Sequence, residues 1–421
     1  MREDKNKRLI LIFDTVFFGL LTVAFSYLLW QLVICQTVYA EIPYEGYRSD
    51  ILAYMQEMQG IDSGYPFPYP LFFMIGRFFM LFMGVDKAIT WAEVLLNAGA
   101  LIALKYYFEK LIRKDGEPKP WVHFVISILT VSCFLLSMWW LPRFGKIVLP
   151  LKSQAYRGTF SGNPWHNATY IATRPFAIVA FFSFVSLLEK YEEKIDIRDA
   201  VIFSVSLFLT TFTKPSFSLL LVSSAGLVMA FRLIKSRFSN FKNTMLLTLC
   251  FVPTFIDLLY EFGGVFGGGT AGGEHGIGFS FFSVWRIYAD SVVAAIFYAN
   301  AMSLVCFIWF IRDIKKDTLY RFTVILFVVS VLEAGLLYEK GPRSVDFNFC
   351  WGYMHGIFFF EVVTVIKLLE HILRKKKADL LTVVGCILFL THLVAGIAYF
   401  KGMYYALDYE TMLPCTWLMP Q

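Results

Sequence analysis

The sequence predicts an all-α membrane protein, a polytopic bundle of about eleven transmembrane helices that forms one domain. Hydrophobic residues make up 57% of the 421 residues, whereas charged residues make up only 17%. Such a chain has more apolar surface than one soluble core buries. The apolar residues also fall into stretches of about 20, the length that crosses a bilayer. We therefore expect a single transmembrane domain over residues 1–421, with the lipid bilayer as part of its environment.

The apolar stretches define the expected spans. They cover residues 9–34, 88–109, 121–140, 171–188, 200–212, 217–234, 244–260, 291–311, 322–338, 351–368 and 380–399. The long run from 200 to 234 is divided in two because Lys214 precedes Pro215. Proline lacks a backbone donor and ends or kinks a helix.

The basic residues indicate the orientation, because Lys and Arg concentrate in cytoplasmic loops. They cluster before the first span and after the second, sixth, eighth and tenth spans. The N-terminus is therefore expected in the cytoplasm and the C-terminus outside, in what we take to be a bacterial cell membrane. The net charge of +6 is explained by these loops, so we expect no nucleic-acid partner. The extracytoplasmic loops are then residues 35–87, 141–170, 261–290 and 339–350.

The first of these loops predicts two amphipathic helices at the membrane surface. Ile51, Tyr54, Met55 and Met58 recur at helical spacing after Asp50. A second apolar segment, residues 71–83, is too short to span a bilayer and follows a Pro-aromatic stretch. Both segments fit juxtamembrane helices.

This loop resembles that of the GT-C superfamily of polyprenyl-phosphate-sugar-dependent glycosyltransferases, such as the protein O-mannosyltransferases and the aminoarabinose transferase of lipid A. The matching elements are Asp50 with Tyr54, then Tyr69-Pro-Leu-Phe72, then Phe82-Met-Gly84. The Lys-Pro break at 214–215 looks like one in a middle helix of those enzymes. The family motif has two acidic residues, whereas Ser49 and Ile51 flank Asp50 here. No cofactor is assigned, and the question of a divalent metal stays open.

The resemblance implies an extracytoplasmic active site in which Asp50 is the general base. An inverting transfer needs a carboxylate that takes the proton of the acceptor hydroxyl as it attacks the anomeric carbon. The alternative is that Asp50 only caps the surface helix, a common role of aspartate. We expect Tyr54 to contribute to acceptor binding or sugar stacking.

The second outer loop is a candidate donor-binding segment. It carries Arg143, Lys152 and His166, although outer loops are generally poor in basic residues. A leaving polyprenyl phosphate is an anion, which such groups would stabilise. Trp165 beside His166 offers a sugar-stacking surface. The alternative roles are headgroup contacts for the cations and a structural hydrogen bond for the histidine.

The third and fourth outer loops add further candidates. A glycine-rich run containing Glu274 and His275 predicts a lid, although such runs also serve as plain flexible loops. Arg286 is a candidate phosphate ligand that alternatively snorkels to the interface. Arg343 and Trp351 suggest phosphate binding and sugar stacking, or else an Arg343–Asp346 pair beside an aromatic belt.

The function we expect is transfer of a sugar from a polyprenyl-phosphate donor to a surface glycan, lipid or polymer. Two alternatives remain. A polysaccharide polymerase would use arginines of the outer loops and would not need Asp50. A lipid-linked glycan flippase or transporter would show buried basic residues inside the bundle and an internal repeat.

Overall fold

The protein is helical almost throughout. The computed structural model describes residues 2–40, 49–116, 118–139, 160–266, 276–341, 343–375 and 377–404. Helices of the first half are α1 (Arg2–Ala40), α2 (Ile51–Gln59), α3 (Leu71–Met80), α4 (Val85–Ile112), η1 (Arg113–Asp115), α5 (Pro120–Cys133), α7 (Ala168–Lys190) and α8 (Ile197–Thr213). The second half contributes α9 (Ser216–Lys235), α10 (Phe241–Leu249), α11 (Val252–Phe266), α12 (Trp285–Tyr288), α13 (Val292–Ala299), α14 (Ala301–Phe310), η3 (Ile311–Lys315), α15 (Thr318–Leu336), α16 (Cys350–Arg374) and α17 (Leu380–Tyr404). Strands β1 (Ile277–Phe279) and β2 (Leu337–Glu339) pair antiparallel, with Ile277 opposite Glu339.

A bundle of apolar helices, as expected for a membrane protein, is confirmed. In the described part of the chain, six helices are long and apolar enough to cross a membrane, namely α1, α4, α7, α9, α15 and α17. Two bent pairs, α10–α11 at 50° and α13–α14 at 78°, raise the number to eight if each is one span.

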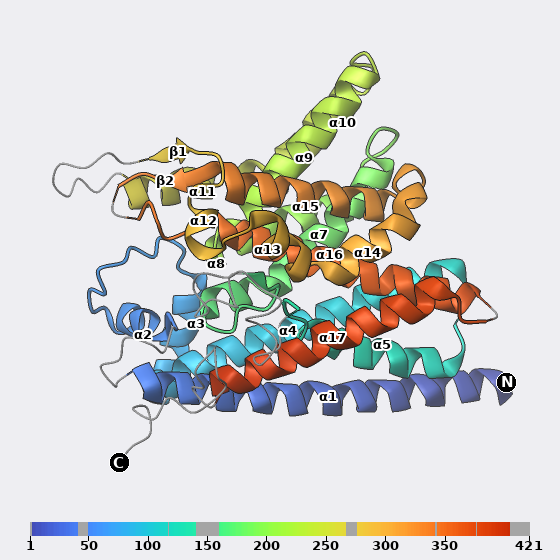
Figure 1. Cartoon of the computed structure of the whole chain (residues 1–421), viewed down its shortest axis with the longest axis horizontal. Coiled ribbons are helices and arrows are strands. Elements are labelled where there is room, and N and C mark those ends of the chain that lie inside the picture. Colours follow the sequence, from blue (N-terminus) through green and yellow to red (C-terminus); the bar gives the residue numbers. More distant parts are fainter. Residues whose placement is uncertain are drawn as a thin grey trace.

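The expected count of about eleven spans is not confirmed. Helices α5 and α8 have only 14 and 17 residues. Helix α16 has 25 residues but includes His355, Glu361 and Lys367, and it does not meet the apolar criterion. All three nevertheless lie within the bundle, beside helices that do qualify (Figure 1).

Two expectations about helix boundaries are confirmed. Helix α8 ends at Thr213 and α9 begins at Ser216, so the Lys214-Pro215 pair does divide the long apolar run. In the first loop, α2 buries Ile51, Tyr54, Met55 and Met58 on one face, as the spacing predicts. Helix α3 packs against α2, and the Arg77 guanidinium holds the pair together by bonding the Glu57 carboxylate at 3.0 Å.

The expected outer loops gather at one end of the bundle. The backbone N–H of Asp50 donates to the carbonyl of His166 at 3.0 Å, which joins the first loop to the second. The Lys340 N–H donates to the Gly276 carbonyl at 2.8 Å beside the β1–β2 pair, which joins the third to the fourth. Figure 1 places α2, α3, β1 and β2 at the end opposite the N-terminus. Residues far apart in sequence can therefore share one site there.

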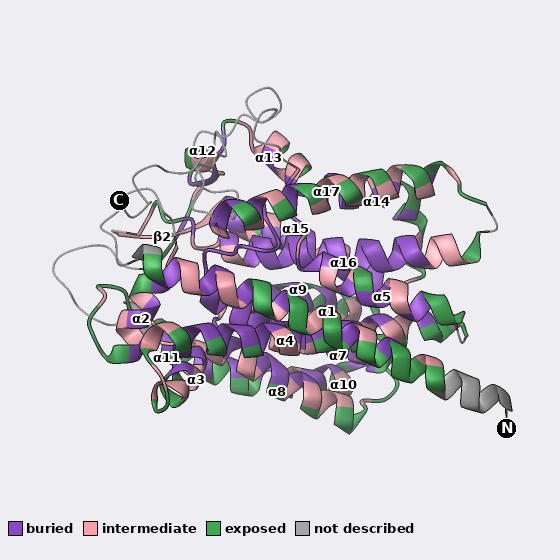
Figure 2. Cartoon of the chain, turned by 90° about the horizontal axis from the view of Figure 1, so that it is seen from below, coloured by how far each residue is buried: buried purple, intermediate pink, exposed green. Residues whose placement is uncertain are grey.

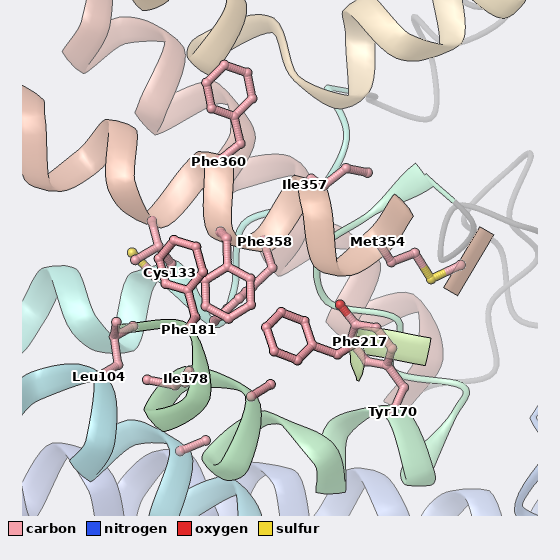
Figure 3. Packing of buried hydrophobic residues seen from close by; sticks show 14 of the residues in the cluster. Leu104, Cys133, Tyr170, Ile178, Phe181, Phe217, Met354, Ile357, Phe358 and Phe360 are labelled. Atoms are coloured by element: carbon pink, nitrogen blue, oxygen red, sulfur yellow. The ribbon is translucent and has the colours of Figure 1, made fainter. Parts of the chain in front are cut away.

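Helix α16 is the centre of the bundle. Its residues from Cys350 to Leu369 are almost all buried, and Figure 2 shows it enclosed by other helices. Aromatic rings fill the space around it, with Phe359 stacked on Phe181 at 4.3 Å and Phe358 near Phe134 at 5.5 Å. Figure 3 shows Phe181, Phe217 and Phe358 meeting between α7, α9 and α16. Packing of this kind holds membrane helices together, since lipid tails are as apolar as the side chains themselves.

Gly396 fixes how closely α17 approaches the segment after α5. A Cβ atom at this position would lie 1.5 Å from the carbonyl oxygen of Leu135. The nearby His392 ring accepts from or donates to neighbours on both sides, with Nδ1 2.8 Å from the Ser137 carbonyl and Nε2 3.3 Å from the Met302 N–H. Only glycine permits this contact.

Gly396→Ala should therefore destabilise the protein by about 1–3 kcal/mol, the usual cost of overpacking. Gly226→Ala in α9 is the matched control, because a Cβ there meets no atom within 4 Å. The measurement is the melting temperature of both variants in detergent. Equal melting temperatures for the two would show that α17 does not pack this closely.

Candidate functional site

The carboxylate of Asp50 is held by side chains and not used as a helix cap. Asp50 occupies the N-cap position of α2 but its side chain makes no capping hydrogen bond. Its Oδ2 instead accepts from the Asn167 side-chain amide at 2.5 Å and from the Tyr54 hydroxyl at 3.4 Å. The Ser49 hydroxyl accepts from the Ile51 N–H at 3.3 Å in the place a cap would take. The carboxylate is therefore positioned from α7, across the interface between the first and second loops.

Asn167 connects all the polar groups of the site. Its Oδ1 caps α7 by accepting from the Tyr170 N–H at 2.8 Å, and this bond fixes which way the amide faces. The same oxygen accepts from Lys214 Nζ at 3.3 Å, while Nδ2 donates to Asp50 and to the Tyr54 hydroxyl at 2.7 Å. The side chain is 1% exposed. One amide thus holds a carboxylate on its nitrogen side and an ammonium on its oxygen side.

Lys214 brings a buried positive charge to this site. It lies in the break between α8 and α9, is 7% exposed, and donates to the Thr169 hydroxyl at 3.2 Å as well as to Asn167. Its Nζ lies 4.4 Å from the centre of the Trp351 ring and 5.8 Å from that of Tyr69. Burial lowers the pKa of Lys214 to about 8, although the charge of Asp50 opposes this shift.

The surroundings of Lys214 differ from those of the other two buried lysines in the described residues. Lys105 lies 3.1 Å from Asp14 and 2.6 Å from Glu109. Lys367 contacts three carboxylates, those of Asp317, Glu370 and Asp313 at 2.9, 2.9 and 3.7 Å. Lys214 has no carboxylate within 4.0 Å among the described residues, so its charge is left for another anion.

His166 lies beside this cluster but is neutral. Burial lowers its pKa to about 4, against the opposing effect of Asp50 and with a smaller contribution from Lys214. Its ring is 5.6 Å from that of Trp351, and Nδ1 is 3.4 Å from the Tyr399 hydroxyl. As a candidate phosphate ligand, His166 therefore offers a hydrogen bond and not the positive charge we expected.

Two of the three expected stacking residues are placed differently from the expectation. The Trp165 ring is 1% exposed and packs on Phe25 and Phe400 at 6.0 and 5.2 Å, so it belongs to the core. The Tyr54 ring is enclosed by Phe67, Phe72 and Phe73, and only its hydroxyl reaches the site. Trp351 is partly exposed and stays a candidate for sugar stacking.

The remaining predicted residues fall into two groups. Arg343 pairs with Glu339 and Asp346, both at 3.4 Å, and its charge helps lower the pKa of Lys214. Arg286 is exposed on α12, outside the contacts around Asp50. The others lie outside the described residues, namely Arg143, Lys152, Glu274 and His275.

The sequence analysis treated the polar residues inside the spans as isolated, but several lie together. The Arg174 guanidinium is 1% exposed, donates to the Gly162 carbonyl at 3.1 Å, and lies between the rings of Phe134 and Phe358 at 5.3 and 5.4 Å. Glu93 interacts with it electrostatically from α4. The Glu361 carboxylate faces Gly162 from α16 and lies 3.8 Å from His392. No spacing rule links residues on four separate helices, so the sequence gave no signal for this group.

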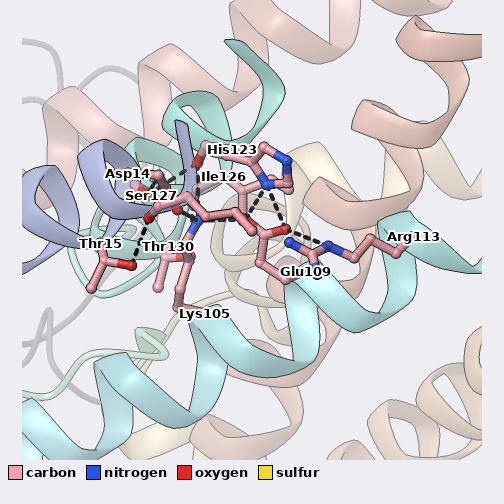
Figure 4. Close-up of polar contacts among 10 residues, drawn as sticks. Asp14, Thr15, Lys105, Glu109, Arg113, His123, Ile126, Ser127 and Thr130 are labelled. Atoms are coloured by element: carbon pink, nitrogen blue, oxygen red, sulfur yellow. Dashed lines mark hydrogen bonds and ion pairs between the residues drawn. The ribbon is translucent and has the colours of Figure 1, made fainter. Parts of the chain in front are cut away.

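A second polar cluster, far from Asp50 in the sequence, has the composition of a metal site. Asp14, Glu109 and His123 place one ligand atom each within 4.8 Å of one another. Lys105 lies among them, however, and bonds both carboxylates as well as the His123 carbonyl (Figure 4). The lysine already neutralises this cluster, which ties α1 and α5 to α4.

Comparison with protein-family models, with curated proteins and with solved structures gives no significant match for this chain. The function must be argued from the site itself. Its chemical content is a partly exposed carboxylate, an ammonium without a carboxylate partner, and a partly exposed indole, brought together from the first loop, α7, the α8–α9 break and α16.

The lowered pKa of Lys214 predicts a pH-dependent stability. Lysine in an unfolded chain titrates near 10.4, so between about pH 8 and 10 the unfolded state binds more protons than the folded state, and stability rises with pH. Wild type should therefore gain stability relative to Lys214→Met from pH 8 to 10, with a constant difference below pH 7. Melting temperatures of both proteins over this range test it. A difference that stays constant throughout would mean that the burial of Lys214 is wrong.

Proposed function

We propose that the protein is a membrane glycosyltransferase that transfers a sugar from a polyprenyl-phosphate donor to a glycan, lipid or polymer at the extracytoplasmic face. The observation that carries the proposal is the pairing of the Asp50 carboxylate and the Lys214 ammonium on the two sides of the Asn167 amide. The similarity of the first loop to GT-C enzymes supports the same reaction class.

The two charges match the two ends of the reaction. The acceptor oxygen forms a bond to the anomeric carbon, and Asp50 takes the proton that this oxygen loses. The bond from the anomeric carbon to the phosphate oxygen breaks, and polyprenyl phosphate leaves with the electron pair. Lys214 would stabilise this negative charge in a site from which water is largely excluded, where such an interaction is strongest.

The absence of a carboxylate near Lys214 is what makes it suitable as a phosphate ligand. Burying an ammonium without a counter-ion costs free energy, which is why its pKa is low. A phosphate that approaches Lys214 supplies the missing charge and raises that pKa. Binding of the anionic donor is thereby favoured over binding of a neutral lipid.

The neighbouring helices suit a substrate with a lipid tail. Helix α3 exposes Met74 and Phe78, and the adjoining turn exposes Leu81 and Phe82, at 53, 58, 74 and 71%. Such a helix inserts its apolar face into the boundary of the bilayer. It would hold the site at the depth where the phosphate of a membrane-anchored donor lies.

The direct test measures transfer of labelled sugar from polyprenyl-phosphate donors in membranes. Asp50→Asn should lower the rate by about 10²–10⁴, the usual contribution of a general base. Donor binding should remain, because Lys214 is retained. Asp62→Asn is the matched control, since Asp62 is an exposed carboxylate of the same loop. Unchanged transfer by Asp50→Asn would contradict the base assignment and favour a polysaccharide polymerase.

The buried polar group around Arg174 favours a second candidate function, translocation of a lipid-linked glycan. Ionisable residues inside a membrane bundle commonly mark a path for a polar substrate. Arg174 is, however, enclosed by aromatic rings and bonded to Gly162, which also suits a structural role.

Translocation can be separated from transfer in liposomes that contain a fluorescent polyprenyl-phosphate sugar. If the protein is a transferase only, wild type and Arg174→Met should leave the label in its original leaflet. Accessibility of the inner-leaflet label to a membrane-impermeant quencher, present with wild type and lost in Arg174→Met, would instead establish translocation.

A further inference from the structure

Helix α11 presents a polar stripe to the protein and an apolar face to the lipid. Thr254, Asp257 and Glu261 recur at i, i+3 and i+7 and are 0, 7 and 3% exposed. On the other side, Ile256, Leu259 and Tyr260 are 64, 74 and 73% exposed. The stripe faces α8, the helix with which α11 has its main contact. Packing alone would favour the opposite pattern, so the buried polar face requires another explanation.

The oxygen atoms of this stripe lack hydrogen-bond partners within the described chain. They are the Thr254 hydroxyl, Oδ2 of Asp257 and both carboxylate oxygens of Glu261. The only charged side chain among the described residues that acts on Glu261 is Asp257, which is also acidic. A buried oxygen without a partner costs about 1–3 kcal/mol, and a buried carboxylate more. Something outside the described residues must therefore satisfy them.

Other buried acids of the bundle show how this chain neutralises such groups itself. Asp14 and Glu109 receive Lys105, as Figure 4 shows. Glu93 has Arg174 in its electrostatic surroundings, and Glu361 has His392 at 3.8 Å. The stripe on α11 is the exception among these described groups. A cluster that the chain has not filled is a candidate for an external cation.

We propose that Thr254, Asp257 and Glu261 bind a hard divalent cation. Oxygen donors of this type are those that Mg²⁺, Ca²⁺ and Mn²⁺ prefer, and two carboxylates balance a charge of two. The helix is also interrupted at Cys250 and Phe251, between α10 and α11, one turn before Thr254. Broken membrane helices recur at ion sites because they free backbone carbonyls close to acidic side chains.

This site is separate from Asp50 but lies near it. Glu261 acts electrostatically on Tyr69, whose ring is 5.8 Å from Lys214 Nζ. A cation on α11 would remove the negative charge of Glu261 from that neighbourhood. Its binding does not require that sugar transfer be the reaction, so the two proposals can fail independently.

The test uses Mn²⁺ and the purified protein in detergent. Free Mn²⁺ has a strong paramagnetic resonance signal that is lost on binding, so a titration gives the stoichiometry and the dissociation constant. Wild type should bind one Mn²⁺ saturably. Asp257→Asn and Glu261→Gln should each weaken binding at least tenfold, and Thr254→Val should weaken it less.

The matched control is Glu93→Gln, which alters a buried carboxylate on a different helix and should leave Mn²⁺ binding unchanged. Thermal melting without Mn²⁺ checks that each variant folds, and the near-isosteric amides make loss of the fold improbable. No saturable binding by wild type, or wild-type affinity in both folded carboxylate variants, would overturn the proposal and leave these groups as protonated acids.

Discussion

The hydrogen bonds of one side-chain amide, that of Asn167, determine the arrangement of the candidate site. Because Oδ1 must face the first turn of α7, Nδ2 must face the Asp50 carboxylate. The carboxylate is thereby held on the nitrogen side of the amide, and Lys214 on the oxygen side. The charges share a rigid connection although they lie 164 residues apart along the chain. A helix cap, usually a local feature, here organises contacts from four segments.

The cost of burying charge explains why these contacts matter in a membrane bundle. Lys105 and Lys367 are each neutralised by carboxylates of the chain, and both lie in networks that tie helices together. Lys214 and the acids of α11 are not neutralised in this way within the described residues. Groups that a fold leaves without a counter-charge are those for which a ligand provides the largest gain in free energy. On this reasoning, the structure separates charges that hold the bundle together from charges that await a substrate or an ion.

Local patterns in the sequence predicted much of the fold. Apolar stretches and the helical spacing after Asp50 located most helices, and the Lys-Pro pair located the break at 214. The span count was less certain because α5 and α8 are short and α16 is protected by its neighbours, which allows it to carry polar residues. Composition does not reveal whether a helix faces lipid or protein.

The candidate site was predicted less completely. Asp50 was found because it precedes an amphipathic helix, and Tyr54 lies one turn beyond it. Lys214 was noticed only as part of a helix break, since nothing local shows that its side chain reaches Asn167. Trp165 was misassigned because an aromatic residue in a loop suggests a surface, whereas this loop folds back into the bundle. Long-range packing decides these placements, and a single sequence does not encode it in any short pattern.

The central claim is that Asp50 and Lys214 act as one unit, and a double-mutant cycle on the rate of sugar transfer tests it most directly. The four proteins are wild type, Asp50→Asn, Lys214→Met and the double variant. Residues that act together are strongly non-additive, so the double variant should lose little more activity than the worse single variant. If the two losses simply multiply, the carboxylate and the ammonium act independently, and the site described around Asn167 is not the catalytic unit.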